Sequence, residues 1–198
     1  MKKGFTLIEL LVVIAILAVL ATAVVLVLNP VELLKQGRDS TRISDLAAVN
    51  SAMSLWVSDV IAATGWPTTY AATSMRCTSN VSTTKPSAFA IGSSPCTFAP
   101  NTTTSGTGWI PLDLTLIAGG SPLPRLPIDP NNGSLNCTAP GIPLICEYAM
   151  NVSSTVGIYK IAAKMESVKF NTGGGAQVTN VDGGTDAGWY EIGSNLSL

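Results

Sequence analysis

The chain has 198 residues, of which 46% are hydrophobic and 12% are charged, against about 25% charged residues in an average soluble domain. High hydrophobicity with a net charge of −1 excludes an intrinsically disordered chain, and the near balance of 11 basic and 12 acidic residues gives no basic surface for nucleic acid. Histidine is absent, which removes the commonest general base and metal ligand and with them most familiar enzyme classes.

The hydrophobic excess lies at the N-terminus. Leu10–Leu28 comprises 19 residues with no charge and one hydroxyl group, on Thr22. The apolar stretch reaches back to Phe5 with a single interruption, Glu9, for a total of 24 residues. A helix of this length is about 36 Å long, and roughly 20 apolar residues cross a bilayer. The sequence therefore predicts a membrane-spanning helix over residues 5–28.

Three interpretations of this segment compete. Lys2, Lys3 and the tripeptide Ala21–Ala23 resemble a cleaved secretory signal, but the apolar run is longer than such a signal carries. A plain single-pass anchor, with the lysines inside and the remainder outside, leaves the carboxylate of Glu9 without a partner. The third interpretation supplies this partner as the α-amino group of a new N-terminus created by cleavage.

The third interpretation has a specific pattern behind it. Lys2–Leu10 contains a basic leader, then Gly4, then the hydrophobic Phe5, then Glu9 as the fifth residue counted from Phe5. This pattern resembles the class III signal of type IV pilins and type II secretion pseudopilins. The resemblance implies that a prepilin peptidase removes residues 1–4, cutting between Gly4 and Phe5, and methylates Phe5. It also implies that Glu9 pairs with the Phe5 ammonium of a neighbouring subunit in a homopolymeric filament.

A second helical stretch follows Asn29-Pro30. Proline kinks a helix, and the apolar pattern then resumes with helical spacing, so we expect one kinked helix over residues 5–63. Its apolar stripe consists of Ile43, Leu46, Asn50, Met53, Val57 and Val60. The charged residues expected mostly off this stripe are Arg38, Asp39, Arg42 and Asp45. Gly65–Pro67 supplies stop signals, so residues 29–65 are predicted to form the amphipathic half that enters a globular domain.

Residues 66–198 are predicted to form that domain. As far as about Asn136 the chain is rich in Ser, Thr, Gly, Pro and Asn, which predicts long loops. Leu126–Pro130 resembles the Leu-Pro-x-Asp-Pro segment that precedes the antiparallel strands of pseudopilins. Three strands are predicted, at Ile145–Met150, Gly157–Met165 and Trp189–Ile192, with a hairpin turn at residues 151–155. The predicted fold class is α+β and pilin-like: one long N-terminal helix on a small antiparallel sheet of about three strands, with long loops.

Four cysteines lie beyond the membrane segment and allow three pairings: Cys77, Cys96, Cys137 and Cys146. The positive-inside orientation places them in an oxidising space, where disulfides persist. We favour the local pairs, because Cys137–Cys146 closes a hairpin and Cys77–Cys96 ties the first loop. No zinc spacing is present, so no metal site is predicted there.

Asp182 and Asp186 lie in a glycine-rich loop that offers oxygen ligands to calcium, which the major pseudopilins bind in a comparable late loop. The spacing is not that of an EF-hand, and Asp-Gly is ordinary turn chemistry. We therefore expect a turn without a metal ion.

The sequence predicts a structural prepilin with no catalytic activity and no cofactor. Its expected partners are other copies of itself, the prepilin peptidase, the inner-membrane assembly machinery and, before assembly, membrane lipid; no specific nucleic acid is expected. The expected location is the inner membrane, N-terminus cytoplasmic, then a cell-surface or periplasmic filament. Two alternatives remain: a type II secretion pseudopilin, favoured by the Leu126–Pro130 segment, and a membrane-tethered binding module that never polymerises.

Overall fold

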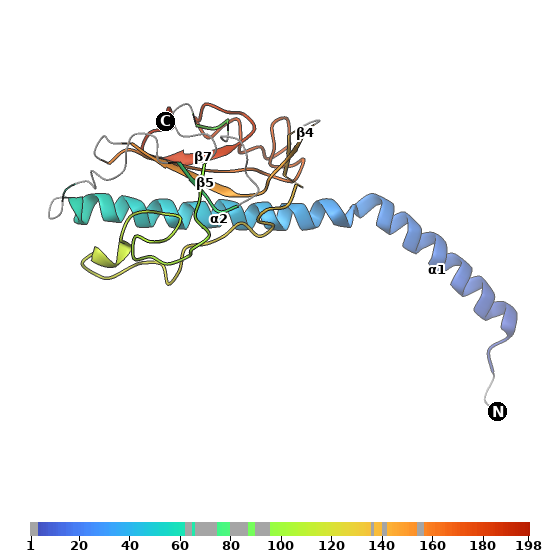
Figure 1. The fold of residues 1–198 in the computed structure, drawn as a ribbon. Coiled ribbons are helices and arrows are strands. Elements are labelled where there is room, and N and C mark those ends of the chain that lie inside the picture. Colours follow the sequence, from blue (N-terminus) through green and yellow to red (C-terminus); the bar gives the residue numbers. More distant parts are fainter. Residues whose placement is uncertain are drawn as a thin grey trace.

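A helical rod and one globular domain make up the molecule (Figure 1). The computed structural model describes residues 4–61, 65, 75–79, 87–89, 96–135, 137–139, 142–153 and 157–198. The domain surrounds the second half of the rod, and the first half projects away from it alone (Figure 1). This is the predicted α+β, pilin-like arrangement.

The rod consists of helix α1, Leu7–Leu28, and helix α2, Pro30–Asp59. Asn29 separates the two helices and has a left-handed backbone (φ 40°). It is both the C-cap of α1 and the N-cap of α2. Its side chain accepts a hydrogen bond from the Glu32 backbone N–H, and Pro30 occupies the first helical position, where no N–H is needed. The rod bends at this point, which confirms the predicted kink (Figure 1). The expected helix end at Ala63 lies outside the described residues.

The main sheet has five strands in the order β2-β1-β5-β6-β7. Its strands are β1 Met75–Cys77, β2 Thr97–Phe98, β5 Tyr148–Val152, β6 Tyr159–Ala163 and β7 Tyr190–Gly193. All neighbours are antiparallel except β1 and β2, which are parallel. A separate hairpin pairs β3, Cys137–Ala139, with β4, Ile142–Leu144.

The three predicted strands correspond to β5, β6 and β7, but the predicted sheet was too small and wholly antiparallel. The additional strands have two or three residues each, which is too short to show the alternation that identifies a strand in sequence. The predicted turn was also placed early, because Asn151 and Val152 still belong to β5. Residues 154–156 of that turn lie outside the described residues.

Helix α2 lies between the sheet and a loop segment that contains the short 3-10 helix η1, Leu114–Leu116 (Figure 1). The rings of Trp109, on this segment, and Tyr148, on β5, pack against each other in the same core, with their centroids 6.1 Å apart. The fully or nearly fully buried residues of α2 are Asp39, Arg42, Leu46, Val49, Ala52, Met53 and Trp56, and its C-cap Val60 is buried as well. The predicted stripe was therefore wrong in two respects. The charged residues Asp39 and Arg42 lie on the buried face, and so do Val49, Ala52 and Trp56. Three members of the predicted stripe are only partly buried: Ile43, Asn50 and Val57.

Gly193 provides a test of the β6–β7 register. A Cβ atom at this position would lie 2.3 Å from the backbone oxygen of Tyr159, so we expect Gly193→Ala to lower the free energy of unfolding by about 1–3 kcal/mol. Gly175→Ala is the control, because a Cβ there meets no atom within 4 Å. Urea unfolding in detergent, followed by tryptophan fluorescence, measures both variants. Equal midpoints for the two would contradict this register.

Candidate functional site

The Gly4–Phe5 peptide bond precedes the first helix in non-helical backbone. Helix α1 begins only at Leu7, with the extended residue Thr6 (φ −80°, ψ 152°) as its N-cap. The side chain of Phe5 is 86% exposed, and a Cβ atom at Gly4 would meet nothing within 4 Å. This bond is therefore exposed and lies outside the helix.

Glu9 lies one turn beyond this bond and forms a capping box with Thr6. The backbone N–H and the hydroxyl of Thr6 donate to Oε2 of Glu9 at 2.8 and 2.7 Å, and the Glu9 N–H donates to the Thr6 hydroxyl at 3.3 Å. Both bonds to the carboxylate end on one oxygen. Oε1 therefore carries no hydrogen bond from any residue that the structure describes, and it can accept a donor from outside the chain.

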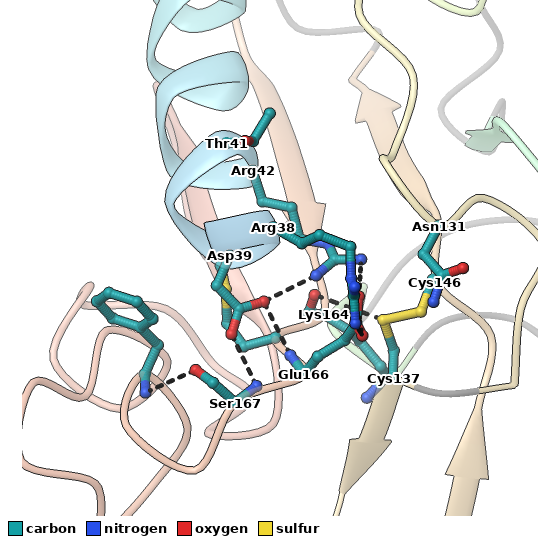
Figure 2. Close-up of polar contacts among 12 residues, drawn as sticks. Arg38, Asp39, Thr41, Arg42, Asn131, Cys137, Cys146, Lys164, Glu166 and Ser167 are labelled. Atoms are coloured by element: carbon teal, nitrogen blue, oxygen red, sulfur yellow. Dashed lines mark hydrogen bonds and ion pairs between the residues drawn. A yellow bond between two sulfur atoms is a disulfide. The ribbon is translucent and has the colours of Figure 1, made fainter. Parts of the chain in front are cut away.

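A buried ionic cluster joins α2 to the globular domain where the helix enters it (Figure 2). The guanidinium of Arg42, which is fully buried, forms two hydrogen bonds of 2.7 Å with the Asp129 carboxylate. It also donates to Oε1 of Glu166 at 2.6 Å and to Oδ1 of Asp39 at 2.8 Å. Arg38 adds a bidentate pair with Glu166, with contacts of 2.6 and 2.9 Å.

Backbone groups complete this cluster. The two oxygens of Asp39 accept the backbone N–H groups of Glu166 and Ser167 at 2.9 and 2.8 Å (Figure 2). Asp129 likewise accepts the N–H of Asn131 at 2.8 Å. Two guanidinium groups thus meet three carboxylates, and N–H donors stabilise the excess negative charge. Removing one partner of such a network leaves a buried charge uncompensated, which costs about 3–5 kcal/mol.

The pKa values of the cluster are shifted by burial and by its charges. Burial alone would raise the pKa of Glu166, but hydrogen bonds from Arg38 and Arg42 outweigh it and lower that pKa below its ordinary value. Burial alone would lower the pKa of Arg42. The Asp129 and Glu166 carboxylates outweigh this effect and raise that pKa above its ordinary value. Both groups are therefore charged at neutral pH, as structural ion pairs and not as proton donors or acceptors for chemistry.

Disulfide bonds join Cys77 to Cys96 and Cys137 to Cys146. The Cα atoms of the two pairs are 6.0 and 5.0 Å apart, respectively. These separations are within the range that a disulfide spans. The second bond lies beside the ionic cluster (Figure 2). It also connects to the turn after Asp129, since the N–H of Cys146 donates to the Ser134 carbonyl at 2.8 Å.

Asp182 and Asp186 lie in a loop before β7 and serve as turn residues there. Asp182 accepts the N–H of Gly184 at 2.9 Å through one oxygen and the N–H of Glu191 at 2.7 Å through the other. Asp186 accepts the N–H of Gly188 at 2.7 Å. Both carboxylates are thus engaged with backbone donors, which is the turn chemistry expected from the sequence.

Comparison with known proteins gives one match. Residues 1–25 match the family described as the prokaryotic N-terminal methylation motif. The chain carries the class III signal of type IV pilins and pseudopilins. No curated protein and no solved structure matches the chain.

This pilin-type signal and the fold agree with each other. The signal marks a structural family, and neither it nor the fold indicates an enzyme. Leu7–Val25 is long and apolar enough to cross a membrane, and no residue of this stretch is buried inside the domain, as a membrane-anchored precursor requires. The exposed Gly4–Phe5 bond and the capped Glu9 both fall within the matched residues.

The ionic cluster was not predicted from the sequence, although the sequence contains two indications of it. The three-residue spacing of Asp39 and Arg42 places them on one helix face, and Arg42 is four residues before the buried Leu46 on that face. Asp129 is the acidic residue of the Leu126–Pro130 segment. Nothing in the sequence indicated Glu166, which lies 124 residues after Arg42 and reaches it only in the folded domain.

The ionic cluster predicts acid lability. Because the pKa of Glu166 is lower in the folded than in the unfolded chain, its contribution to stability is full above the unfolded value of about 4.5. The contribution is lost progressively as the pH falls from there through the lower folded pKa. We expect Glu166→Gln to lower the free energy of unfolding at neutral pH by about 1.5–3 kcal/mol and to flatten its acid dependence. The loss is smaller than for complete removal of a partner, because glutamine keeps one oxygen that accepts hydrogen bonds. Urea unfolding over a pH series measures both effects.

Asp59→Asn is the control for this series, because Asp59 is exposed and accepts only the Ala118 N–H among the described residues. It should keep the acid dependence of the parent. If Glu166→Gln and the parent lose stability in parallel below pH about 4.5, the cluster does not cause the acid lability.

Proposed function

We propose that this chain is the precursor of a structural subunit of a type IV pilus or a related filament. Residues 1–4 act as the leader, a prepilin peptidase cleaves between Gly4 and Phe5, and Phe5 becomes the N-methylated terminus. Residues 5–28 then form the membrane and filament-core helix, and residues 29–65 carry the chain into the globular domain of residues 66–198. The single observation behind this proposal is the methylation motif at the start of a projecting apolar helix.

The exposure of α1 supports a role in assembly. Its apolar side chains, such as Ile8, Leu17 and Val27, are 58–82% exposed, and none of the described side chains of this helix is buried in the domain. A surface of this kind must be covered by lipid or by other apolar helices, because its exposure to water is costly. Membrane lipid covers it before assembly, and α1 helices of other copies cover it in the filament.

Glu9 has the geometry to select the register of that assembly. Its Oε1 is open to an external donor, and cleavage creates an ammonium group at Phe5 of every neighbouring subunit. In an apolar bundle a lone carboxylate is costly, and an ion pair reduces that cost. Each incoming subunit thus gains most when its ammonium group meets the Glu9 of a copy already in place.

The domain is proposed to lie outside the cytoplasm, with the N-terminus cytoplasmic. Lys2 and Lys3 favour this orientation, and both disulfides then lie in an oxidising space. A pseudopilin of type II secretion is the second candidate. It is favoured by Asp129, because this residue of the Leu-Pro-x-Asp-Pro segment accepts two hydrogen bonds from Arg42 and thereby fixes the segment against α2.

Mass spectrometry of the protein purified from its own host tests the processing. We expect the intact mass of a chain that begins at Phe5, carries one additional methyl group and lacks the four thiol hydrogens. Alkylation should modify cysteines only after reduction. A native chain that begins at Met1 or Val24 would contradict the pilin proposal.

Substitution of Glu9 separates a filament subunit from a membrane-tethered module. We expect Glu9→Leu and Glu9→Ala to insert into the membrane and to be cleaved normally but to reduce filament yield at least about tenfold, because the ammonium group loses its partner. Val13→Leu, one turn further along α1, is the control and should assemble normally. Sheared-filament yield and membrane fractionation give the two readouts. A tethered module predicts no defect in any function of the Glu9 variants.

A further inference from the structure

Lys160 is a buried cation that takes no part in the N-terminal signal, the membrane helix or the ionic cluster around Arg42. Residues of β6 alternate in direction, and Tyr159 and Ile161 belong to the core formed with α2. Lys160 therefore points to the opposite face of the sheet, where its side chain is fully buried. An ammonium group in such a place is costly unless oxygen atoms surround it.

Four oxygens surround the Lys160 ammonium group. They are Oε1 of Glu191 at 2.7 Å, the Leu196 backbone oxygen at 2.8 Å, the Thr185 hydroxyl at 3.1 Å and the Leu198 backbone oxygen at 3.2 Å. The ring of Phe89 adds a cation–π contact at 5.5 Å. Carboxylate, hydroxyl and backbone oxygens are also the ligands of calcium, but calcium needs them at about 2.3–2.6 Å. The cage has the size that an ammonium group requires.

The Glu191 carboxylate, which pairs with Lys160, also binds the loop before β7. The second oxygen of Glu191, Oε2, accepts the backbone N–H groups of Thr185 and Asp186. The loop backbone lies so close to this carboxylate that a Cβ atom at Gly184 would be 1.6 Å from Oε2. Asp182 binds the N–H of Glu191 at 2.7 Å and thereby closes the loop on itself. The shape of the loop therefore depends on an ionised, fully buried Glu191.

We propose that the Lys160 ammonium group is the internal cation that closes this loop, so that residues 182–188 need no divalent metal ion. The charge of Lys160 stabilises the Glu191 carboxylate, which in turn binds the loop backbone. The same ammonium group binds the Leu196 and Leu198 oxygens and so fastens the segment after β7 to β6. The surface formed by this loop keeps one shape whatever the calcium concentration of the medium. This inference concerns the globular domain and stands whether or not the chain forms a filament.

Hydrogen exchange of the full-length chain in detergent tests the proposal. The parent, Lys160→Met and the control Lys169→Met are compared in millimolar calcium chloride and in excess chelator. We expect the parent and Lys169→Met, whose lysine is exposed, to show the same protection of the Thr185 and Asp186 amides in both media. Lys160→Met should lose at least about tenfold of this protection in both, because Glu191 loses its counter-ion.

The amides of β5, Tyr148–Val152, are the internal reference for global unfolding. If Lys160→Met also loses protection there, Glu191→Gln replaces it: this variant keeps the side-chain shape, removes the charge pair and should expose the same loop amides. Loss of loop protection in the parent on chelation would overturn the proposal in favour of a metal ion. Full protection in Lys160→Met, or in Glu191→Gln where that variant replaces it, would overturn it as well.

Discussion

The contacts of Arg42 determine how the two halves of the molecule are joined. Its guanidinium, buried on α2, binds Asp129 from the long loop, Glu166 from the segment after β6 and Asp39 from its own helix. Three parts of the chain that are remote in sequence thus converge on one cation. An ion pair in so buried a place adds little net stability over apolar packing, but it tolerates few arrangements. The cluster therefore fixes where α2 enters the domain.

This position matters because α1 and the domain require different surroundings. Helix α1 is apolar and uncovered, whereas the domain has its own core around Trp109 and Tyr148. Asn29 separates the two by ending one helix and capping the next. The Arg42 cluster lies where α2 enters the domain (Figure 2).

Electrostatic partners also organise the opposite face of the sheet. Lys160 and Glu191 are fully buried there, and Lys164 lies 4.4 Å from the Trp189 ring. Burial lowers the pKa of Lys164 to about 8, although Asp186 and Glu147 oppose the shift. Charged residues therefore have a large structural role in this chain although they are few, because several of them lie inside the domain.

The sequence by itself determined the processing signal, the apolar helix, the kink at Asn29-Pro30 and the three longer strands, since each depends on neighbours along the chain. It could not show the short strands β1 and β2, which exist only because β1 pairs with the remote strand β5 and β2 pairs with β1. Nor could it show that Asp39, Arg42 and Lys160 are buried. Tertiary structure alone decided this, because a charged side chain leaves water only where distant residues supply its partners.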